Sequence, residues 1–258
     1  MSNNQPIAVF DSGVGGISIL RELIKHMPNE NYIYYGDSAN APYGSKSHDE
    51  IKYATLKNAA MLINMGAKAL VVACNTATSV AIDDIRRLYS DIPVIGVEPA
   101  LKPAVQFKPN STILVMATPT TLSESKFSSL MSRYGETSKI IPLPCRRLAK
   151  MVEDGILEGD IIDEYLGELF KPYKDVHIDS IVLGCTHYPF VKKSILKMFD
   201  YKVELFDGAY GTAKETKRRL YEKNLQSEQT ENGSIDIMTS ADINKFSELA
   251  HKLLNADI

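Results

Sequence analysis

Short runs of aliphatic and β-branched residues recur along the chain, separated by longer stretches of mixed polarity. A strand that is buried on both faces of a parallel sheet is apolar at nearly every position, so each short run is predicted to be such a strand. The first four predicted strands are residues 7–10, 32–35, 69–73 and 94–97, and the next four are residues 112–116, 140–143, 180–184 and 203–206.

The stretches between these runs carry apolar residues at the three- and four-residue spacing of amphipathic helices. The predicted helices are residues 17–26, 49–64, 77–89, 126–134, 147–153, 161–171 and 191–199. Regular alternation of strands and helices predicts the α/β fold class, with parallel sheets covered by helices on both faces.

The two halves of the chain resemble each other. The sequence IAVFDS at residues 7–12 corresponds to ILVMAT at residues 113–118, and Cys74 and Cys185 are separated by a similar offset. These landmarks predict two similar parallel-sheet α/β units with pseudo-twofold symmetry and an active site in the cleft between them. A chance similarity between two parallel strands is the alternative.

Boundaries between the units are predicted near residues 98–103 and 207–208. We expect residues 1–98 plus 208–258 to form the first unit and residues 99–207 the second. The tail contains a predicted basic helix (212–223), a polar loop (224–234), a strand (235–238) and a last helix (241–254). Since the second unit already has its strands, the tail is expected to return to the first.

Composition narrows the function classes. The 258 residues are 44% hydrophobic and 24% charged, and Lys+Arg 29 against Asp+Glu 32 gives a net charge of −3 without a basic block, so no nucleic-acid partner is expected. No apolar run approaches the ~20 residues of a bilayer span, and residues 1–6 lack signal-peptide features, which predicts a cytoplasmic protein without membrane association. Three cysteines without a CxxC pair predict neither a disulfide framework nor a metal site.

Two cysteines sit in matched settings. Cys74 follows the apolar run 70–73 and Cys185 follows the run 181–184, and each leads directly into polar side chains. Ligands of open α/β sheets bind at the carboxyl ends of the strands. One such cysteine would be an ordinary candidate nucleophile, whereas two, one in each half, predict thiols that face a single substrate from opposite sides.

Two loops that follow strands are candidate binding segments. The sequence DSGVGG at residues 11–16 opens a helix, whose free N–H groups suit an anion. It lacks the glycine spacing of dinucleotide-binding or Walker-type phosphate loops, so a carboxylate is the simpler ligand. Asp11 either tunes a neighbouring thiol or caps the helix. The second loop, residues 36–44, offers the Tyr43 hydroxyl and the Gly44 N–H group.

Polar residues follow each thiol directly. Asn75 and Thr76 come after the first, and Thr186 and His187 come after the second. Amide and hydroxyl groups at a strand end suit an α-amino or α-carboxylate group, and His187 is placed to assist proton transfer or to stabilise a thiolate.

Two other residues have less distinctive settings. Cys145 also follows a strand-like run but lacks polar followers, so it is predicted to be a buried and inert thiol. Glu153 is, by position alone, an acid near a helix end.

A thiolate and a thiol on opposite faces of a stereocentre can remove one proton and return another from the far side. The outcome is inversion, and the sequence carries no signature of a metal, flavin or pyridoxal site that would assist it, so no cofactor is expected. Hydrolysis through a thioester needs only one cysteine with a base and leaves the second thiol unexplained.

Four motifs, taken together, carry a resemblance to a known family: DSGVGG at 11–16, PYG at 42–44, ACNT at 73–76 and GCTHYP at 184–189. They are similar to those of the bacterial glutamate racemases, in the cofactor-independent aspartate/glutamate racemase superfamily, and the similarity runs from Ile7 to about Leu220. The resemblance implies interconversion of L- and D-glutamate, which supplies D-glutamate for peptidoglycan.

The resemblance also implies roles for individual residues. Cys74 and Cys185 become the two acid/base residues, the first taking the proton from D-glutamate and the second from L-glutamate, and Asp11, Glu153 and His187 become supporting groups. The residues implied to hold the amino acid are Asp11, Ser12, Pro42, Tyr43, Gly44, Asn75, Thr76, Thr118, Thr121, Thr186 and His187.

The sequence departs from the family pattern at two loop positions. Thr120 stands where many members have glycine, and Asn40 where many have arginine. Both departures affect the expected detail of the active-site loops and neither affects the thiols.

Several readings of the activity stay open. A racemase of the same superfamily that acts on aspartate or another substrate fits paired thiols equally well, and the segment at 11–16 is what favours glutamate. Two alternatives belong to other functional classes. One is a hydrolase or decarboxylase with one essential cysteine, and the other is a pure binding module. We expect a small-molecule partner, glutamate, and a homodimer.

Overall fold

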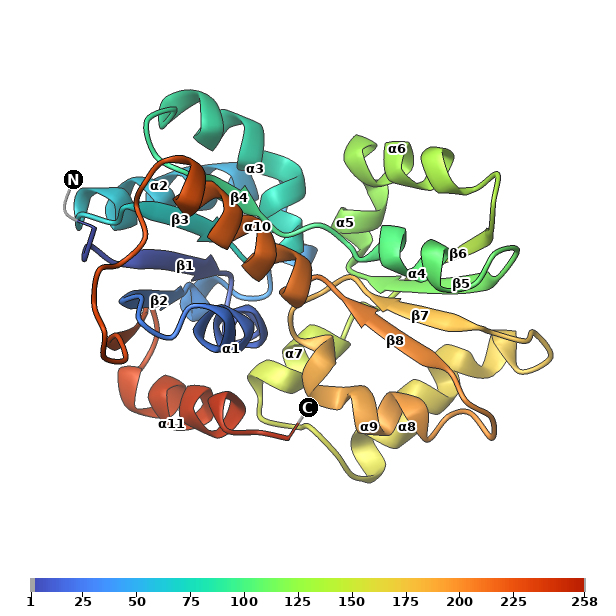
Figure 1. The fold of residues 1–258 in the computed structure, drawn as a ribbon. Coiled ribbons are helices and arrows are strands. Elements are labelled where there is room, and N and C mark those ends of the chain that lie inside the picture. The colour runs from blue at the N-terminus through green and yellow to red at the C-terminus, as the bar shows by residue number, and fades with distance from the viewer. Residues whose placement is uncertain (1–2, 258) are drawn as a thin grey trace.

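The computed structural model describes residues 3–257, which form two parallel sheets lying side by side (Figure 1). The five-stranded sheet has the order β4-β3-β1-β2-β9, from Val94–Gly96, Ala69–Val72, Ile7–Asp11, Tyr32–Gly36 and Ile235–Thr239. The four-stranded sheet has the order β6-β5-β7-β8, from Lys139–Pro144, Thr112–Ala117, Ser180–Leu183 and Glu204–Asp207. Every strand pair is parallel, which confirms the predicted fold class.

The two sheets repeat one topology. The order β2-β1-β3-β4 within the first sheet is the order β6-β5-β7-β8 of the second, so β1 is equivalent to β5 and β3 to β7. In each sheet the chain pairs its first two strands on one side and later returns to the other side of the first strand. The point where the order reverses therefore lies between β1 and β3 in one sheet and between β5 and β7 in the other.

Helices cover both faces of each sheet (Figure 1). On the first sheet, α2 (His48–Asn64) and α3 (Asn75–Leu88) pack on one face, and α1 (Ile17–His26), α10 (Ala209–Glu222) and α11 (Ile243–Leu254) on the other. On the second, α4 (Leu101–Phe107), α5 (Pro119–Ser123) and α6 (Ser125–Tyr134) cover one face, and α7 (Leu148–Glu153), α8 (Asp160–Phe170) and α9 (Lys192–Leu196) the other. Short 3-10 turns η1 (Ser38–Asn40), η2 (Tyr43–Ser45), η3 (Lys171–Tyr173) and η4 (Tyr188–Val191) complete the structure.

One apolar cluster joins the two halves. Ile17 and Leu20 of α1 belong to the same buried cluster as Val152 of α7 and Tyr188 of η4. Because this cluster spans both sheets, the cleft between them is closed at its base by packed side chains rather than by a flexible linker alone.

The predicted strands are observed within one residue at each end, and the tail behaves as expected. Strand β9 pairs with β2, and α10 lies beside α1, so residues after 208 return to the first sheet. The division of the chain into units at residues 98 and 208 stays a prediction.

The prediction missed two short helices. The segment 98–103, interpreted as a boundary, contains the start of α4, and α5 begins at Pro119 with Thr118 as its N-cap. Pro99 and Pro103 favoured a boundary over a helix at the start of α4, and α5 (sequence PTTLS) has Leu122 as its one aliphatic residue, so it shows no helical spacing of apolar positions.

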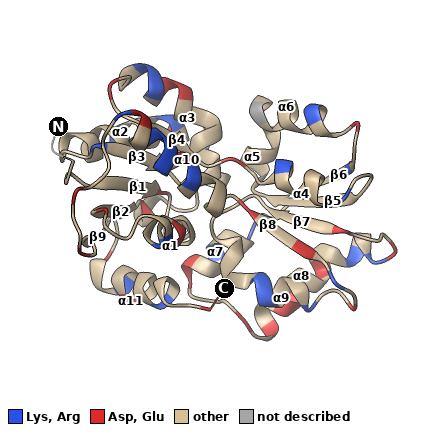
Figure 2. Cartoon of the chain, in the orientation of Figure 1, with Lys and Arg blue, Asp and Glu red and all other residues tan. Residues whose placement is uncertain are grey.

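The expectations about membrane association and a signal peptide can be compared with the structure only over the described residues. Within residues 3–257 no helix has the length and apolar character to cross a membrane. The expectation about signal-peptide features rests on residues 1–6, of which the first two lie outside the described residues. Figure 2 shows Lys and Arg interspersed with Asp and Glu over both halves.

Candidate active site

The two chain-reversal points bring the candidate motifs together. In the first sheet Asp11 ends β1 and Cys74 follows β3; in the second Thr118 follows β5 and Cys185 follows β7. The carboxyl ends of the two sheets face each other, since the Thr186 hydroxyl donates a hydrogen bond of 3.0 Å to Asp11 Oδ2 across the cleft. Both predicted thiols therefore lie where an open α/β sheet places its ligand.

Cys74 is the N-cap residue of α3, and its thiol is almost enclosed. Its sulfur accepts a hydrogen bond from the Ala77 N–H group at 3.5 Å, and its S–H donates to Ser12 Oγ at 3.4 Å. Burial, with the nearby carboxylate of Asp11 acting in the same direction, raises the pKa of Cys74 to about 12, although the Ser12 and Ala77 contacts oppose this. The thiol is therefore protonated at neutral pH in this structure.

Cys185 belongs to a chain of three side chains. His187 Nδ1 lies 3.5 Å from the Cys185 sulfur, and His187 Nε2 lies 2.5 Å from Glu153 Oε1. Burial disfavours the charged imidazole, but its interactions with Cys185 and Glu153 outweigh burial and raise the pKa of His187 well above its usual range. The imidazolium then directs one N–H toward the carboxylate and the other toward the sulfur. Glu153, which by position alone was an acid near a helix end, is thus paired with this imidazole.

Glu153 ends α7 in the second half of the site but is held mainly by the first. Its carboxylate accepts hydrogen bonds from the Val14 N–H group at 2.7 Å and from the Ser38 hydroxyl at 3.3 Å. The acid therefore couples the loop after β1 to the imidazole beside Cys185.

The glycines of the loop after β1 make this close approach possible. A Cβ atom on Gly13 would lie 1.8 Å from Glu153 Oε1, and one on Gly15 would lie 2.4 Å from His187 Nδ1. The glycine pattern is thus explained by contact with the second half of the site rather than by a phosphate-binding turn.

Asp11 is fully buried and does not cap a helix. It accepts hydrogen bonds from the Gly13 N–H group at 3.0 Å and from Thr186, whereas α1 has Gly16 as its N-cap and no side-chain cap. Burial raises the pKa of Asp11, and the positive charge of His187 opposes that shift. Of the two interpretations made from the sequence, helix capping is wrong.

Three threonine hydroxyls converge from both halves of the site. Thr76 at the start of α3 lies 3.0 Å from Thr118 and 3.2 Å from Thr121, and the last two are 3.0 Å apart. Beside them, Asn75 Oδ1 is buried and has no hydrogen-bond partner among residues 3–257. These groups offer a polar ligand several donors and acceptors in one place.

The loop after β2 reaches the same place. The Tyr43 hydroxyl donates to Asp37 Oδ2 at 2.6 Å, so it is engaged within the loop, and burial together with Asp37 raises its pKa. Pro42 follows a cis peptide bond and leads into η2. Gly44 lies against the second half of the site, because a Cβ there would be 2.6 Å from the Thr118 Cβ.

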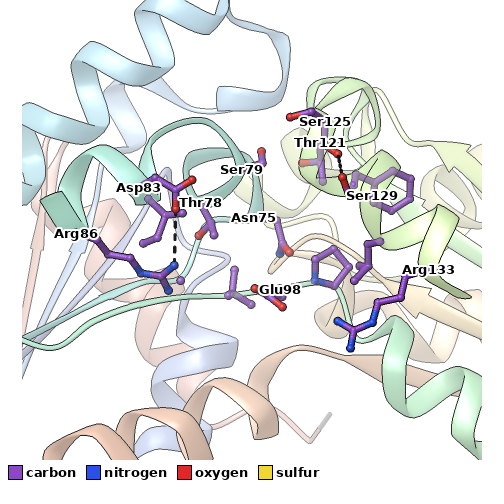
Figure 3. A pocket seen from close by; sticks show the side chains of 16 residues that line it. Asn75, Thr78, Ser79, Asp83, Arg86, Glu98, Thr121, Ser125, Ser129 and Arg133 are labelled. Carbon is purple, nitrogen blue, oxygen red and sulfur yellow. Dashed lines mark hydrogen bonds and ion pairs between the residues drawn. The ribbon is translucent and has the colours of Figure 1, made fainter.

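A cavity adjoins the threonine cluster (Figure 3). It has a volume of about 470 Å³ and lies between α3 and α6; Asn75 and Thr121 are among its lining residues, and Arg86 and Arg133 lie on opposite sides of it. Cys74 and Cys185 are only 6% and 8% exposed, so little of either residue is reached by bulk water in this structure.

The sequence did not single out the residues that support the site. Ser18 donates from α1 to both the Gly15 and Thr186 carbonyl oxygens, at 2.9 and 3.0 Å, and Asn58 donates from α2 to Asp37 at 3.1 Å. Both sit at ordinary polar positions of helices, where no local pattern distinguishes them. Cys145 is buried, as predicted, and its thiol donates to the Leu143 carbonyl oxygen.

No group of three or more His, Cys, Asp or Glu side chains in the described part of the chain is arranged to hold a metal ion. The acidic, imidazole and thiol groups instead form hydrogen-bonded pairs, Cys185 with His187 and His187 with Glu153.

Comparison with known proteins places this geometry in context. The family model described as Asp/Glu/hydantoin racemase matches residues 16–243. A glutamate racemase of Clostridium perfringens is 52% identical over 251 residues, covering 97% of this chain and 96% of that protein, and one of Clostridium acetobutylicum is 52% identical over 252 residues, covering 98% of each. The crystal structure of a Francisella tularensis glutamate racemase in complex with D-glutamate matches with a TM-score of 0.85 at 32% identity, covering 99% of this chain and 95% of that one.

Proposed function

The chain belongs to the Asp/Glu/hydantoin racemase family and, within it, to the glutamate racemases; on that premise we propose that Cys74 and Cys185 exchange the α-proton of glutamate. The observation that carries the proposal is that the two thiols follow equivalent strands of two sheets whose carboxyl ends face each other. A substrate held between them presents opposite faces of its α-carbon to the two sulfurs.

The proton balance of the reaction needs one thiolate and one thiol. Starting from D-glutamate, the Cys74 thiolate takes the α-proton and forms an S–H bond, while the Cys185 thiol gives its proton to the other face of the carbon. The reverse reaction exchanges the two roles. Since the carbanion is strongly basic, the site must lower the barrier with well-placed acid/base groups and fixed charges.

Supporting groups differ at the two thiols. We propose that His187, together with Glu153, assists proton transfer at Cys185. Asp11 does the same at Cys74. The remaining residues of the site hold the substrate through side chains or backbone: Ser12, Pro42, Tyr43, Gly44, Asn75, Thr76, Thr118, Thr121 and Thr186. Support for this assignment comes from their convergence around the two strand ends.

Circular dichroism of the purified protein tests the function directly. Without added cofactor, the signal of L-glutamate should decay to zero, whereas the signals of L-aspartate and L-glutamine should persist. Equal decay of the aspartate signal would favour the rival substrate. A persistent glutamate signal, together with no α-proton exchange in deuterated water, would favour a binding module.

Independence from cofactors is part of the proposal. Chelators and carbonyl reagents should leave activity intact, and alkylation of the thiols should abolish it. Activity lost on dialysis against a chelator and restored by zinc would contradict this.

The biological setting follows from the activity, since glutamate racemases supply D-glutamate for peptidoglycan. We further propose a cytoplasmic homodimer. Light scattering of the purified protein checks the dimer, and a mass near the 28.6 kDa of one chain would refute it.

A further inference from the structure

A hydrogen bond joins the two halves of the site between two segments that the sequence assigned only to substrate binding. The Thr120 hydroxyl, on α5 of the second half, donates to the Gly44 carbonyl oxygen of η2 in the first half at 3.1 Å. Thr120 is one of the two positions at which the chain departs from the motif it resembles, where glycine would offer no hydroxyl.

The surroundings make this hydrogen bond part of a contact that must open. Gly44 lies against Thr118 on the preceding turn, and Thr118 in turn is bonded to Thr76 of the first half. Both thiols are more than nine-tenths buried. An amino acid can therefore reach them only if the two halves separate at contacts such as these.

The η2 loop is held from its other side as well. Asn58 of α2 donates to Asp37 at 3.1 Å and to the Tyr43 hydroxyl at 3.3 Å, which anchors the residue before Gly44 to the first half. The loop thus has one attachment within its own half and one, through Thr120, to the other half.

We infer that Thr120 is a positioning residue that fastens the Gly44 loop across the cleft and so keeps the substrate site closed. The inference rests on the proposed function, because its role is to hold closed the site where glutamate binds. Closure brings the Gly44 backbone into place for the substrate and keeps water from the thiols.

Replacement of the hydroxyl tests this inference. Thr120→Val keeps the size and shape of the side chain and removes the donor, whereas Thr120→Ser keeps the donor. We expect the KM for glutamate to rise roughly threefold to tenfold in Thr120→Val, the factor that one hydrogen bond typically contributes, with kcat within about twofold. Thr120→Ser should restore KM to within about twofold of the parent.

A matched control lies three residues along the same helix. The Ser123 hydroxyl donates to the Thr120 carbonyl oxygen at 2.9 Å, within α5, so Ser123→Ala removes a hydroxyl without touching the bond to Gly44. It should leave KM unchanged. A Thr120→Ser variant that behaves like Thr120→Val, or a Ser123→Ala variant with the same rise, would overturn the inference.

A second measurement does not depend on catalysis. The rate at which iodoacetamide modifies Cys74, followed by mass spectrometry of its peptide, should rise several-fold in Thr120→Val, while the buried Cys145 reacts at the parent rate. If Cys74 is modified at the parent rate, or if the modification of Cys145 speeds up equally, the hydrogen bond from Thr120 to Gly44 does not close the cleft. A parent protein that fails to racemise glutamate would refute the proposed function, and the alkylation rates would still decide the role of Thr120.

Discussion

The two proposed acid/base residues follow equivalent strands but have different electrostatic surroundings. Cys74 has a hydroxyl, a backbone N–H group and a nearby buried carboxylate, and its thiol is held in the neutral form. Cys185 has an imidazole that is itself paired with a carboxylate. The raised pKa values of Cys74 and His187 therefore favour the protonated form of each group, one in each half of the site.

This asymmetry predicts different defects in partial reactions. Asp11→Asn should mainly slow proton removal by Cys74, and His187→Asn should mainly slow removal by Cys185. Because the equilibrium constant between enantiomers is one, kcat/KM must fall equally in both directions for each variant. Deuterium isotope effects at the α-carbon, measured from each enantiomer, distinguish proton removal by Cys74 from proton removal by Cys185. Isotope effects that remain at parent values in both variants and for both enantiomers would remove these residues from the mechanism.

Stability should depend on pH through His187. Its pKa in the folded protein is raised above the unfolded value near 6.5, so the imidazolium contributes stability that is fully present below about pH 6.5 and is lost as pH rises through the raised pKa. The difference in melting temperature between the parent and His187→Asn should therefore be largest near about pH 6 and shrink on the alkaline side. Thermal melts of both proteins, measured from about pH 6 to the alkaline side, check how the difference in melting temperature depends on pH. A difference that grows with pH would mean that His187 is neutral in the folded state.

Most of the proposed catalytic residues could be located from the sequence because they lie directly after predicted strands. Both thiols and Asp11 lie within two residues of a strand end, and His187 lies two residues from Cys185, so strand prediction placed each at the carboxyl edge of a sheet. The internal resemblance of the two halves then predicted that both edges face one cleft. Ser18 and Asn58 could not be found in that way. Their partners are remote along the chain, and hydrogen bonds across 168 and 21 residues leave no local pattern.

Among the elements, the loop between β1 and α1 carries the tightest constraint. It must pass so close to α7 and to the segment after β7 that side chains cannot fit at Gly13 and Gly15. The loop is therefore a contact between the two halves of the site as well as a proposed binding segment.

Gly15→Ala should displace His187 and reduce kcat/KM by at least about a hundredfold, the cost typical of a misplacement near 1 Å. The matched control is Gly167→Ala in α8, where an added Cβ meets nothing within 4 Å. That variant should keep full activity and gain about 0.5 to 1 kcal/mol of stability, since alanine favours a helix. Steady-state kinetics and chemical denaturation of both variants provide the comparison. A Gly15→Ala protein with parent activity would show that the loop tolerates a shift of His187.

The elements that sequence could not predict are short. Strands of three to six residues were recognised because most of their positions are apolar, while α5 is a single turn capped by Thr118 and started by Pro119. Its existence matters for function, because it carries two hydroxyls of the threonine cluster and Thr120.

On the scale of the whole molecule, the duplicated sheet accounts for the chemistry. Two copies of one strand order place two equivalent strand ends against each other, and each copy supplies one thiol. The internal resemblance of residues 7–12 and 113–118 indicated this arrangement. Which side chains meet across the cleft depends on packing between the halves, as the bond from Thr186 to Asp11 illustrates, and no short segment encodes it.

The central claim is that Cys74 takes the proton from D-glutamate and Cys185 from L-glutamate, and elimination tests it most directly. Elimination from a glutamate with a leaving group on its β-carbon needs only one base, whereas racemisation needs two. Cys74→Ser and Cys185→Ser should each lower racemisation by about 10² to 10⁴. Cys74→Ser should still eliminate from the L enantiomer alone, and Cys185→Ser from the D enantiomer alone. Two variants that retain or lose elimination equally for both enantiomers would contradict the assignment of two facing bases.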